Sequence, residues 1–249
     1  TAISGLELYG RAEPMFREAS TTYPGNKRIL FLLIDVLLKQ EKFTEAMDEV
    51  ERAMVRLGID DGILSAALEI REKVGPKTIA ANAGPKKHAK SSTTVSACLI
   101  VKNEEKHLVR CLNSIKPIVD EIIVVDTGSS DKTRDIATAF GAKLYDFEWT
   151  KDFSAARNYS LSQANGDMIL AIDADEVISA RDYKNFRKMI PKAAARRKAY
   201  NVVTRNYVIK KSSSLWQPND GAYPEEQAGT GWFPSTKVRL FPRSETIRF

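Results

Sequence analysis

The spacing of hydrophobic residues divides the chain into two regions with different periods. Before Gly75, apolar side chains recur every three or four positions, as in Leu30, Leu33 and Leu37, which predicts helices buried on one side. From Val95 onward, short β-branched apolar runs alternate with amphipathic stretches, which predicts strands and helices around a mostly parallel sheet. The expected fold class is therefore α/β, preceded by a small all-α region.

The second region is expected to contain at least five strands and three helices. The predicted strands are 95–101, 121–125, 143–147, 168–172 and 200–208, and the predicted helices are 104–115, 132–140 and 154–163. Sheets of this type bind ligands beyond the carboxyl ends of their strands. The polar residues that directly follow each strand are therefore candidate site residues.

The helical region repeats itself at an offset of 34 positions. The aligned pairs are Tyr9 with Phe43, Ala12 with Ala46, Phe16 with Val50, Ala19 with Ala53 and Pro24 with Gly58. The pattern resembles tetratricopeptide repeats, with a third, partial unit starting near Ile63; a generic helical hairpin is the alternative. We expect a tetratricopeptide-like helical domain over residues 1–78, a linker rich in Gly, Pro, Lys and Ser over 79–94, and an α/β domain over 95–249.

Composition excludes several classes of protein. With 249 residues, 43% of them hydrophobic, the chain can bury a substantial core. No apolar run has the length of a transmembrane helix and no signal peptide is evident, so a cytoplasmic location is expected. Two cysteines, Cys98 and Cys111, are too few for a disulfide framework or a zinc site. The net charge of +6 comes from dispersed residues without a nucleic-acid motif, and a phosphate-bearing small molecule would also suit it.

Polar residues follow the first two predicted strands at the ligand-binding edge. Asp126 ends an apolar strand, where a carboxylate is costly unless it meets a hydrogen-bond donor. The imide or ribose of a nucleoside would supply one. Asp131 is better explained as a helix cap. The candidate ligand-binding residues in these two loops are Lys102, Asn103, Glu104, Asp126, Gly128 and Ser129.

The segment Asp173-Ala174-Asp175-Glu176 directly follows the fourth predicted strand. In an extended chain, Asp173 and Asp175 would lie on the same side and could face one Mg²⁺ or Mn²⁺ ion. A donor diphosphate would complete the coordination and the metal would offset the charge on the departing group. Such a pair also arises by chance, but its place after a fully apolar strand favours a metal site. Upstream, Arg157 is either a phosphate or nucleoside contact or a solvated, ion-paired arginine.

Four motifs in order make the region from Val95 to Phe249 similar to the family 2 glycosyltransferases, which share the GT-A fold. They lie at 100–105, 123–131, 156–158 and 172–176. The resemblance implies that Asp126 contacts the nucleoside base and that Arg157 helps to hold the donor. It also implies that Asp173 and Asp175 bind ribose and metal, Asp175 more directly the metal. Many members carry an aspartate where this chain has Thr127, and the sequence stops before a His-Glu motif, so part of the domain is expected to be missing.

Members that invert the anomeric centre use a carboxylate base. The candidates are Glu225 and Glu226, in a predicted loop flanked by Trp216 and Trp232, which could stack on sugar rings. The alternatives are that the two glutamates are solvated and that the base lies beyond Phe249.

Taken together, we expect a metal-dependent, inverting glycosyltransferase with Mn²⁺ or Mg²⁺ as cofactor. It would move a sugar from a nucleotide diphosphate sugar, with UDP the expected nucleotide, to a protein, peptide or saccharide acceptor. The helical repeats could dock a protein partner. A nucleotidyltransferase and a non-catalytic scaffold are the alternatives.

Overall fold

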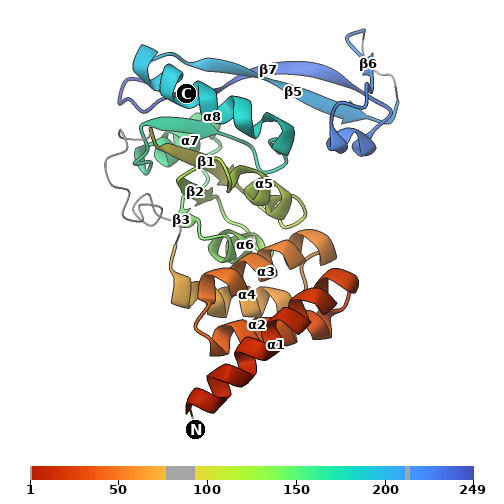
Figure 1. The fold of residues 1–249 in the computed structure, drawn as a ribbon. Helices are drawn as coiled ribbons and strands as arrows, with labels where there is room; N and C mark the ends of the chain where they lie inside the picture. The colour runs from red at the N-terminus through yellow and green to blue at the C-terminus, as the bar shows by residue number, and fades with distance from the viewer. Residues whose placement is uncertain (1, 77–92, 211–213) are drawn as a thin grey trace.

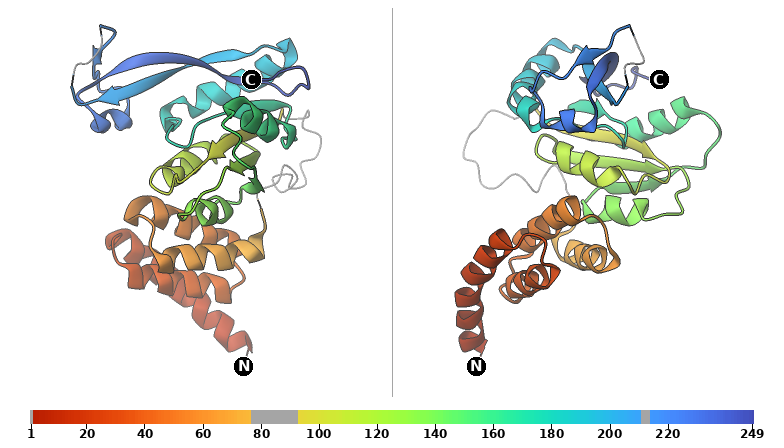
Figure 2. Two further views of the ribbon diagram at one scale, coloured as in Figure 1. Left: turned by 180° about the vertical axis from the view of Figure 1, so that it is seen from behind. Right: turned by 90° about the vertical axis from the view of Figure 1, so that its right-hand side faces the viewer.

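The computed structural model describes residues 2–76, 93–210 and 214–249. A stack of helices lies at one end of the molecule and an α/β unit at the other, with the N-terminus at the far end of the stack (Figures 1 and 2). Among the described residues, no helix is both long enough and apolar enough to cross a membrane. The predicted linker falls almost entirely on residues 77–92, which lie outside the described residues.

The helical stack consists of α1 (Ala2–Thr22), α2 (Lys27–Lys39), α3 (Phe43–Leu57) and α4 (Asp61–Val74). Helices α2 and α4 begin 34 positions apart, at Lys27 and Asp61, and each starts after a side chain that caps it, Asn26 and Asp60 respectively. The predicted repeat is thus confirmed as two helix pairs. The third unit predicted near Ile63 is wrong, because Ile63 lies in α4, the second helix of the second pair.

The sheet has the order β3-β2-β1-β4-β7-β5, with the short β6 beside β7. Its first four strands are parallel, while β7 runs antiparallel to both β4 and β5. The strands are β1 (Val95–Val101), β2 (Glu121–Asp126), β3 (Lys143–Asp146), β4 (Met168–Ala171), β5 (Tyr200–Val208), β6 (Gln217–Pro218) and β7 (Gly231–Pro242). All five predicted strands are confirmed, whereas β6 and β7 were not predicted.

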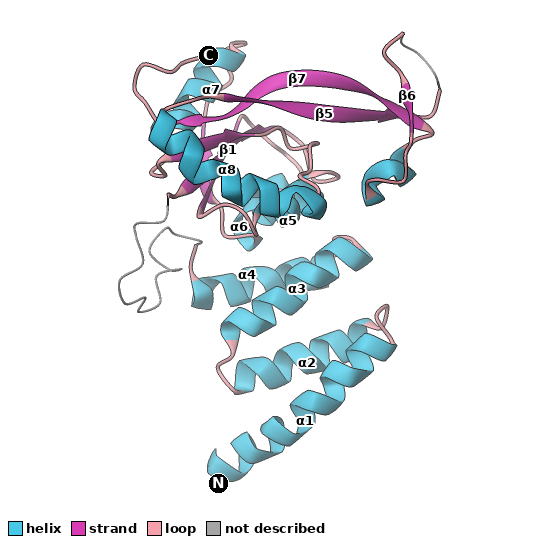
Figure 3. Ribbon diagram, turned by 45° about the horizontal axis from the view of Figure 1, so that its top comes forward, coloured by secondary structure: helices cyan, strands magenta, loops and turns pink. Residues whose placement is uncertain are grey.

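Helices cover both faces of the sheet (Figure 3). They are α5 (Leu108–Ile115), α6 (Thr133–Ala139), α7 (Phe153–Ser162) and α8 (Tyr183–Arg196), with short 3₁₀ helices η1 (Ala180–Asp182) and η2 (Pro224–Ala228). Alternate residues of β1 face opposite sides: Ala97 and Leu99 join the core with α5, α6 and α8, while Cys98 joins the cluster beside α7. Cys98 and Cys111 are buried and unbridged. Helix α8 was not predicted.

One continuous hydrophobic core joins the helical stack to the α/β unit. Helix α3 packs on α5 and α4 packs on α6. At this junction the buried guanidinium of Arg71 donates to the carbonyl of Ala139 at 2.9 Å and pairs with Glu51 at 2.9 Å. Lys116, directly after α5, also pairs with Glu51. The helical stack is therefore packed against the α/β unit through both apolar and ionic contacts.

The junction can be tested by substituting Arg71→Met. Because Glu51 is only 4% exposed, removing one of its partners leaves a buried charge poorly compensated and should lower the free energy of unfolding by about 3 kcal/mol. Urea-induced unfolding measures this loss. The control is Arg52→Met, which breaks an ion pair with Glu49 whose arginine is 60% exposed, and it should change stability by less than ~0.5 kcal/mol. Equal effects of the two substitutions would contradict a buried ionic junction.

Candidate active site

Two loops meet at the carboxyl ends of β1 and β2, where Val101 pairs with Asp126. The amide of Asn103 donates to the Ser129 hydroxyl at 2.9 Å, and the amide of Ser130 donates to the Asn103 side chain at 2.8 Å. The amide of Glu104 donates to the Thr133 hydroxyl at 2.7 Å. The structure therefore brings Asn103, Glu104 and Ser129 together.

The loop backbone also has two residues with positive φ. Asn103 has φ 56° and Gly128 has φ 102°, and these conformations suit asparagine and glycine. Lys102 is exposed beside them. The two loops have a fixed backbone conformation and expose polar groups, as a ligand site requires.

Asp126 is buried at 3% exposure, and its hydrogen-bond donors come from the protein. Ser129 donates from its amide to both carboxylate oxygens at 3.2 and 3.1 Å and from its hydroxyl to Oδ1 at 2.5 Å, and Arg134 donates to Oδ2 at 3.0 Å. The sequence interpretation looked to a nucleoside for this donor and did not identify Arg134. Burial of Asp126 therefore does not by itself require a ligand.

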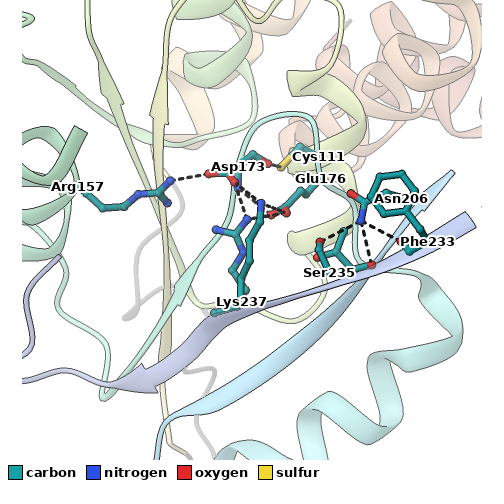
Figure 4. A network of polar contacts seen from close by, with 10 residues as sticks. Cys111, Arg157, Asp173, Glu176, Asn206, Phe233, Ser235 and Lys237 are labelled. Carbon is teal, nitrogen blue, oxygen red and sulfur yellow. Dashed lines mark hydrogen bonds and ion pairs between the residues drawn. The ribbon is translucent and has the colours of Figure 1, made fainter. Parts of the chain in front are cut away.

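Asp173 lies two residues beyond β4, in a cluster of charged side chains drawn from three elements (Figure 4). Arg157 of α7 donates to one carboxylate oxygen at 2.6 Å. Arg239 and Lys237 of β7 donate to the other at 2.5 and 3.3 Å. Burial would raise the pKa of Asp173, but the hydrogen bonds from Arg239 and Arg157 hold it well below its ordinary value. The carboxylate is therefore ionised at all ordinary pH values.

Glu176 belongs to the same cluster. It accepts hydrogen bonds from Arg239 at 2.6 Å and from Lys237 at 3.2 Å. Its amide donates to the carbonyl of Asp173 at 3.0 Å, while the amide of Asp173 donates back to the Glu176 carboxylate at 3.2 Å. Residues 173–176 thus form a closed turn.

Asp175 lies at the tip of this turn and is exposed. The extended conformation expected for 173–175 is wrong, because the turn replaces it. No hydrogen bond or ion pair joins Asp175 to any residue that the structure describes. Within the same part of the chain, no group of three or more His, Cys, Asp or Glu side chains could hold a metal by itself.

A divalent cation nevertheless suits the donor set at this turn. Mg²⁺ in phosphate-binding proteins is held by one or two carboxylates, and substrate phosphate and water supply the other oxygens. The carboxylate of Asp175, two residues after Asp173 and unpaired among the described residues, is of the type that this requirement names.

The two glutamates proposed as bases lie in η2, apart from this cluster. Glu226 is 8% exposed and accepts from the amides of Gly221, Ala222 and Tyr223 at 2.8–3.2 Å. It also pairs with Arg205, which lies opposite Pro234 of β7, three residues before Lys237 and so ~10 Å along the strand. Glu226 therefore stabilises its own loop.

Glu225 differs from Glu226, since one of its carboxylate oxygens is buried without a hydrogen-bond partner among the described residues. Trp232, expected to stack on a sugar, is 8% exposed and is covered by Arg205, whose guanidinium carbon lies 4.2 Å from the ring centroid. The stacking role for Trp232 is therefore wrong.

A hollow of about 870 Å³ lies at the other end of the parallel strands from Asp126 and Asp173. It is lined in part by Glu51, Val95, Asp120 and Arg187. Since Val95 begins β1, this hollow is at the amino ends of the parallel strands, away from the edge at which such sheets bind ligands.

Sequence reasoning missed three basic residues at the ligand-binding edge, where the parallel strands have their carboxyl ends. Lys237 and Arg239 have the i, i+2 spacing that places both on one face of a strand, but this signal is visible only once 231–242 is known to be β7. Arg134 lies in α6, three residues after Asp131, the last residue of this loop to which the sequence interpretation gave a role.

Carboxylates at or just after the ends of the parallel strands β2 and β4 meet arginines from α6, α7 and β7 at the edge where α/β proteins bind ligands. A model of the family described as "Glycosyl transferase family 2" matches residues 96–245. The chain therefore belongs to glycosyl transferase family 2.

Individual relatives match shorter segments. A TPR repeat-containing protein of Synechococcus elongatus is 48% identical over 101 residues, which are 41% of this chain and 25% of that protein. An uncharacterized glycosyltransferase of Rickettsia felis is 44% identical over 85 residues, 34% of this chain and 30% of that one. Glycosyltransferase SunS, derived from the SPbeta prophage in Bacillus subtilis, is 39% identical over 105 residues, 41% and 25% of the two chains. The chain thus spans under a third of the length of these relatives.

Solved structures also match in part. Glucosyl-3-phosphoglycerate synthase from Mycobacterium tuberculosis, in complex with Mn²⁺, UDP and phosphoglyceric acid, is 32% identical over 36% of each chain, with a TM-score of 0.33. S. aureus TarS 1–349 in complex with UDP is 23% identical over 51% of this chain and 38% of that one, with a TM-score of 0.37.

The two aspartates of the turn should differ in their effect on stability. Asp173→Asn removes the charge that compensates buried Arg239 and should lower the free energy of unfolding by about 2 kcal/mol. Asp175→Asn removes no contact and should change it by less than ~0.5 kcal/mol. Urea-induced unfolding of both variants measures the difference. Equal losses would show that Asp175 has a structural partner.

Proposed function

We propose that this chain carries the donor site of a glycosyltransferase that uses a nucleotide diphosphate sugar, with UDP as nucleotide and Mn²⁺ or Mg²⁺ as cofactor. The observation that carries the proposal is the exposed, unpaired carboxylate of Asp175, next to Asp173 and its arginines at the carboxyl end of β4. Membership of glycosyl transferase family 2 supports the reaction class.

In this proposal each loop at the sheet edge has a separate task. Asp126, oriented by Ser129 and Arg134, faces the nucleoside. Lys102, Asn103 and Glu104 line the other side of the nucleoside, and Gly128 permits the tight turn after Asp126. Arg157 and Asp173 hold the donor, and Asp173 and Asp175 hold the divalent cation. The cation, when bound, offsets negative charge on the leaving diphosphate.

The transfer breaks the bond between the anomeric carbon and the diphosphate oxygen and forms one from that carbon to an acceptor oxygen. The electron pair of the broken bond stays on the nucleoside diphosphate, and the acceptor proton passes to a carboxylate base. Displacement on the opposite face inverts the anomeric centre. Glu225 is our candidate base, because its side chain is only partly buried, whereas the oxygens of Glu226 are occupied by backbone amides.

The acceptor is a protein, a peptide or a saccharide. The helical repeats over 1–78 are the proposed docking surface for a protein acceptor or partner, since stacked helix pairs offer extended binding surfaces. We propose that the chain divides into this helical domain, a linker over 79–94 and a transferase domain over 95–249.

The donor site is tested with a panel of nucleotide sugars, measuring Mn²⁺-dependent binding by calorimetry and slow hydrolysis by release of nucleotide. We expect one UDP-sugar to bind and hydrolyse, and Asp175→Asn to weaken both by ~100-fold or more, because a metal ligand is lost. Asp135→Asn is the matched control, since Asp135 is exposed on α6. If no nucleotide sugar binds, or if Asp175→Asn behaves as the control does, the proposal fails.

The base is tested with Glu225→Gln, with water replacing the acceptor. Hydrolysis of the bound donor should fall by about 100-fold, within the range that a general base contributes, while donor affinity stays at the wild-type value. Glu226→Gln should instead lower the unfolding temperature, because the amides of its loop lose a charged acceptor. Wild-type hydrolysis by the Glu225 variant would exclude it as the base.

A further inference from the structure

In the ion pairs around Asp173, cationic side chains outnumber the carboxylates that they contact. Three cationic side chains, Arg157, Lys237 and Arg239, converge on the two carboxylates of Asp173 and Glu176. Lys237 contacts both carboxylates (Figure 4), and so does Arg239. Three cations thus share two carboxylates, while the third carboxylate of the turn, that of Asp175, pairs with none of them.

Two nitrogens of these side chains also lack acceptors. The Nε of Arg239 and the Nη1 of Arg157 are buried without a hydrogen-bond partner among the described residues. The side chain of Arg239 is only 8% exposed. A buried N–H group without an acceptor is unfavourable, and an anion in this place would satisfy it. Cations that outnumber the carboxylates they pair with, and donors without acceptors, therefore point to an anionic ligand.

A diphosphate has the chemistry that such a set recognises. The planar fork of arginine binds phosphate oxygens in pairs, and lysine acts as a mobile point charge. Lys237 is 46% exposed and its two contacts are 3.2 and 3.3 Å long, so it can turn to a ligand at low cost. Arg239 is fixed in β7 beside the end of β4 and presents its guanidinium where the strand stops.

We propose that Lys237 and Arg239 form a cationic clamp with two alternative sets of partners. In the unliganded protein the clamp neutralises Asp173 and Glu176, and when a nucleoside diphosphate enters, it pairs with the diphosphate and releases these carboxylates. The inference rests on the proposed function, whose donor carries this diphosphate. It follows that the clamp promotes nucleotide binding and opposes cation binding in the empty site.

The first measurement is nucleotide affinity by calorimetry in EDTA, with UDP, UMP and uridine as probes. Lys237→Gln and Arg239→Gln should each weaken UDP binding by roughly 10-fold, as expected for a lost charge-assisted hydrogen bond, and leave uridine binding unchanged. Arg239→Lys should recover part of the loss, since the charge remains and the fork does not. Lys188→Gln is the matched control for net charge, since Lys188 is exposed on α8.

The second measurement is Mn²⁺ affinity without nucleotide, by electron paramagnetic resonance. Lys237→Gln and Arg239→Gln should bind Mn²⁺ several-fold more tightly than the wild type, because Asp173 and Glu176 lose competing cations. A merely structural role would not give opposite changes for the two ligands. Circular dichroism confirms folding, and Lys237→Gln, at an exposed position, keeps the test available if Arg239→Gln does not fold.

The outcomes separate the clamp from the donor site itself. If the wild type binds UDP with Mn²⁺ but the two variants bind UDP in EDTA as tightly as the wild type, the clamp is overturned and the proposed function stands. The clamp is also overturned if Mn²⁺ affinity falls along with UDP affinity. If the wild type binds no nucleotide with or without Mn²⁺, the proposed function itself fails.

Discussion

The charge of Asp173 is the constraint around which the site is organised. An apolar, fully buried β4 ends two residues before this carboxylate, and a partly buried charge must be paired. Strand β7 meets that need through its register: Ile169 lies opposite Phe241 and Leu170 opposite Leu240, so that Arg239 follows at the end of β4. A shift of one residue would turn Arg239 and Lys237 to the other face of the sheet. The antiparallel strand is therefore as much a part of the site as the parallel ones.

The helical stack is connected to this site through two helices. Helix α4 packs on α6, and α6 carries Thr133 and Arg134, which hold Glu104 and Asp126 respectively. Helix α3 packs on α5, whose Cys111 thiol lies 3.5 Å from the carbonyl of Asp173. The repeats thus support the helices that position both sets of site residues.

The local parts of the fold were predictable because their signals are local. A buried strand with polar residues after it is visible within a short segment, as in 168–175, and a capped helix start is visible in a few residues, as at Asp60. The 34-residue repeat needs only a comparison of the chain with itself. These features gave the five predicted strands, the helix pairs and the place of Asp126, Arg157 and Asp173 at one edge.

The errors share one cause, which is that the hydrophobic pattern predicts which elements form but not which partner a polar side chain meets. Asp126 was assigned a nucleoside as hydrogen-bond donor, but Arg134 and Ser129 serve it. Trp232 was assigned a sugar, but Arg205 covers it. The turn at 173–176 replaced an extended segment because Glu176 bonds back to the amide of Asp173. None of these contacts follows from composition or period.

The sequence by itself determined where apolar strands end in carboxylates, because burial and periodicity are properties of neighbouring residues. It also determined the helical repeat and the family, whose motifs are short and ordered. Only the tertiary structure decided which cations meet those carboxylates. Lys237 and Arg239 reach Asp173 from more than 60 positions away, and such a meeting depends on strand register, which the chain acquires only when the whole sheet forms.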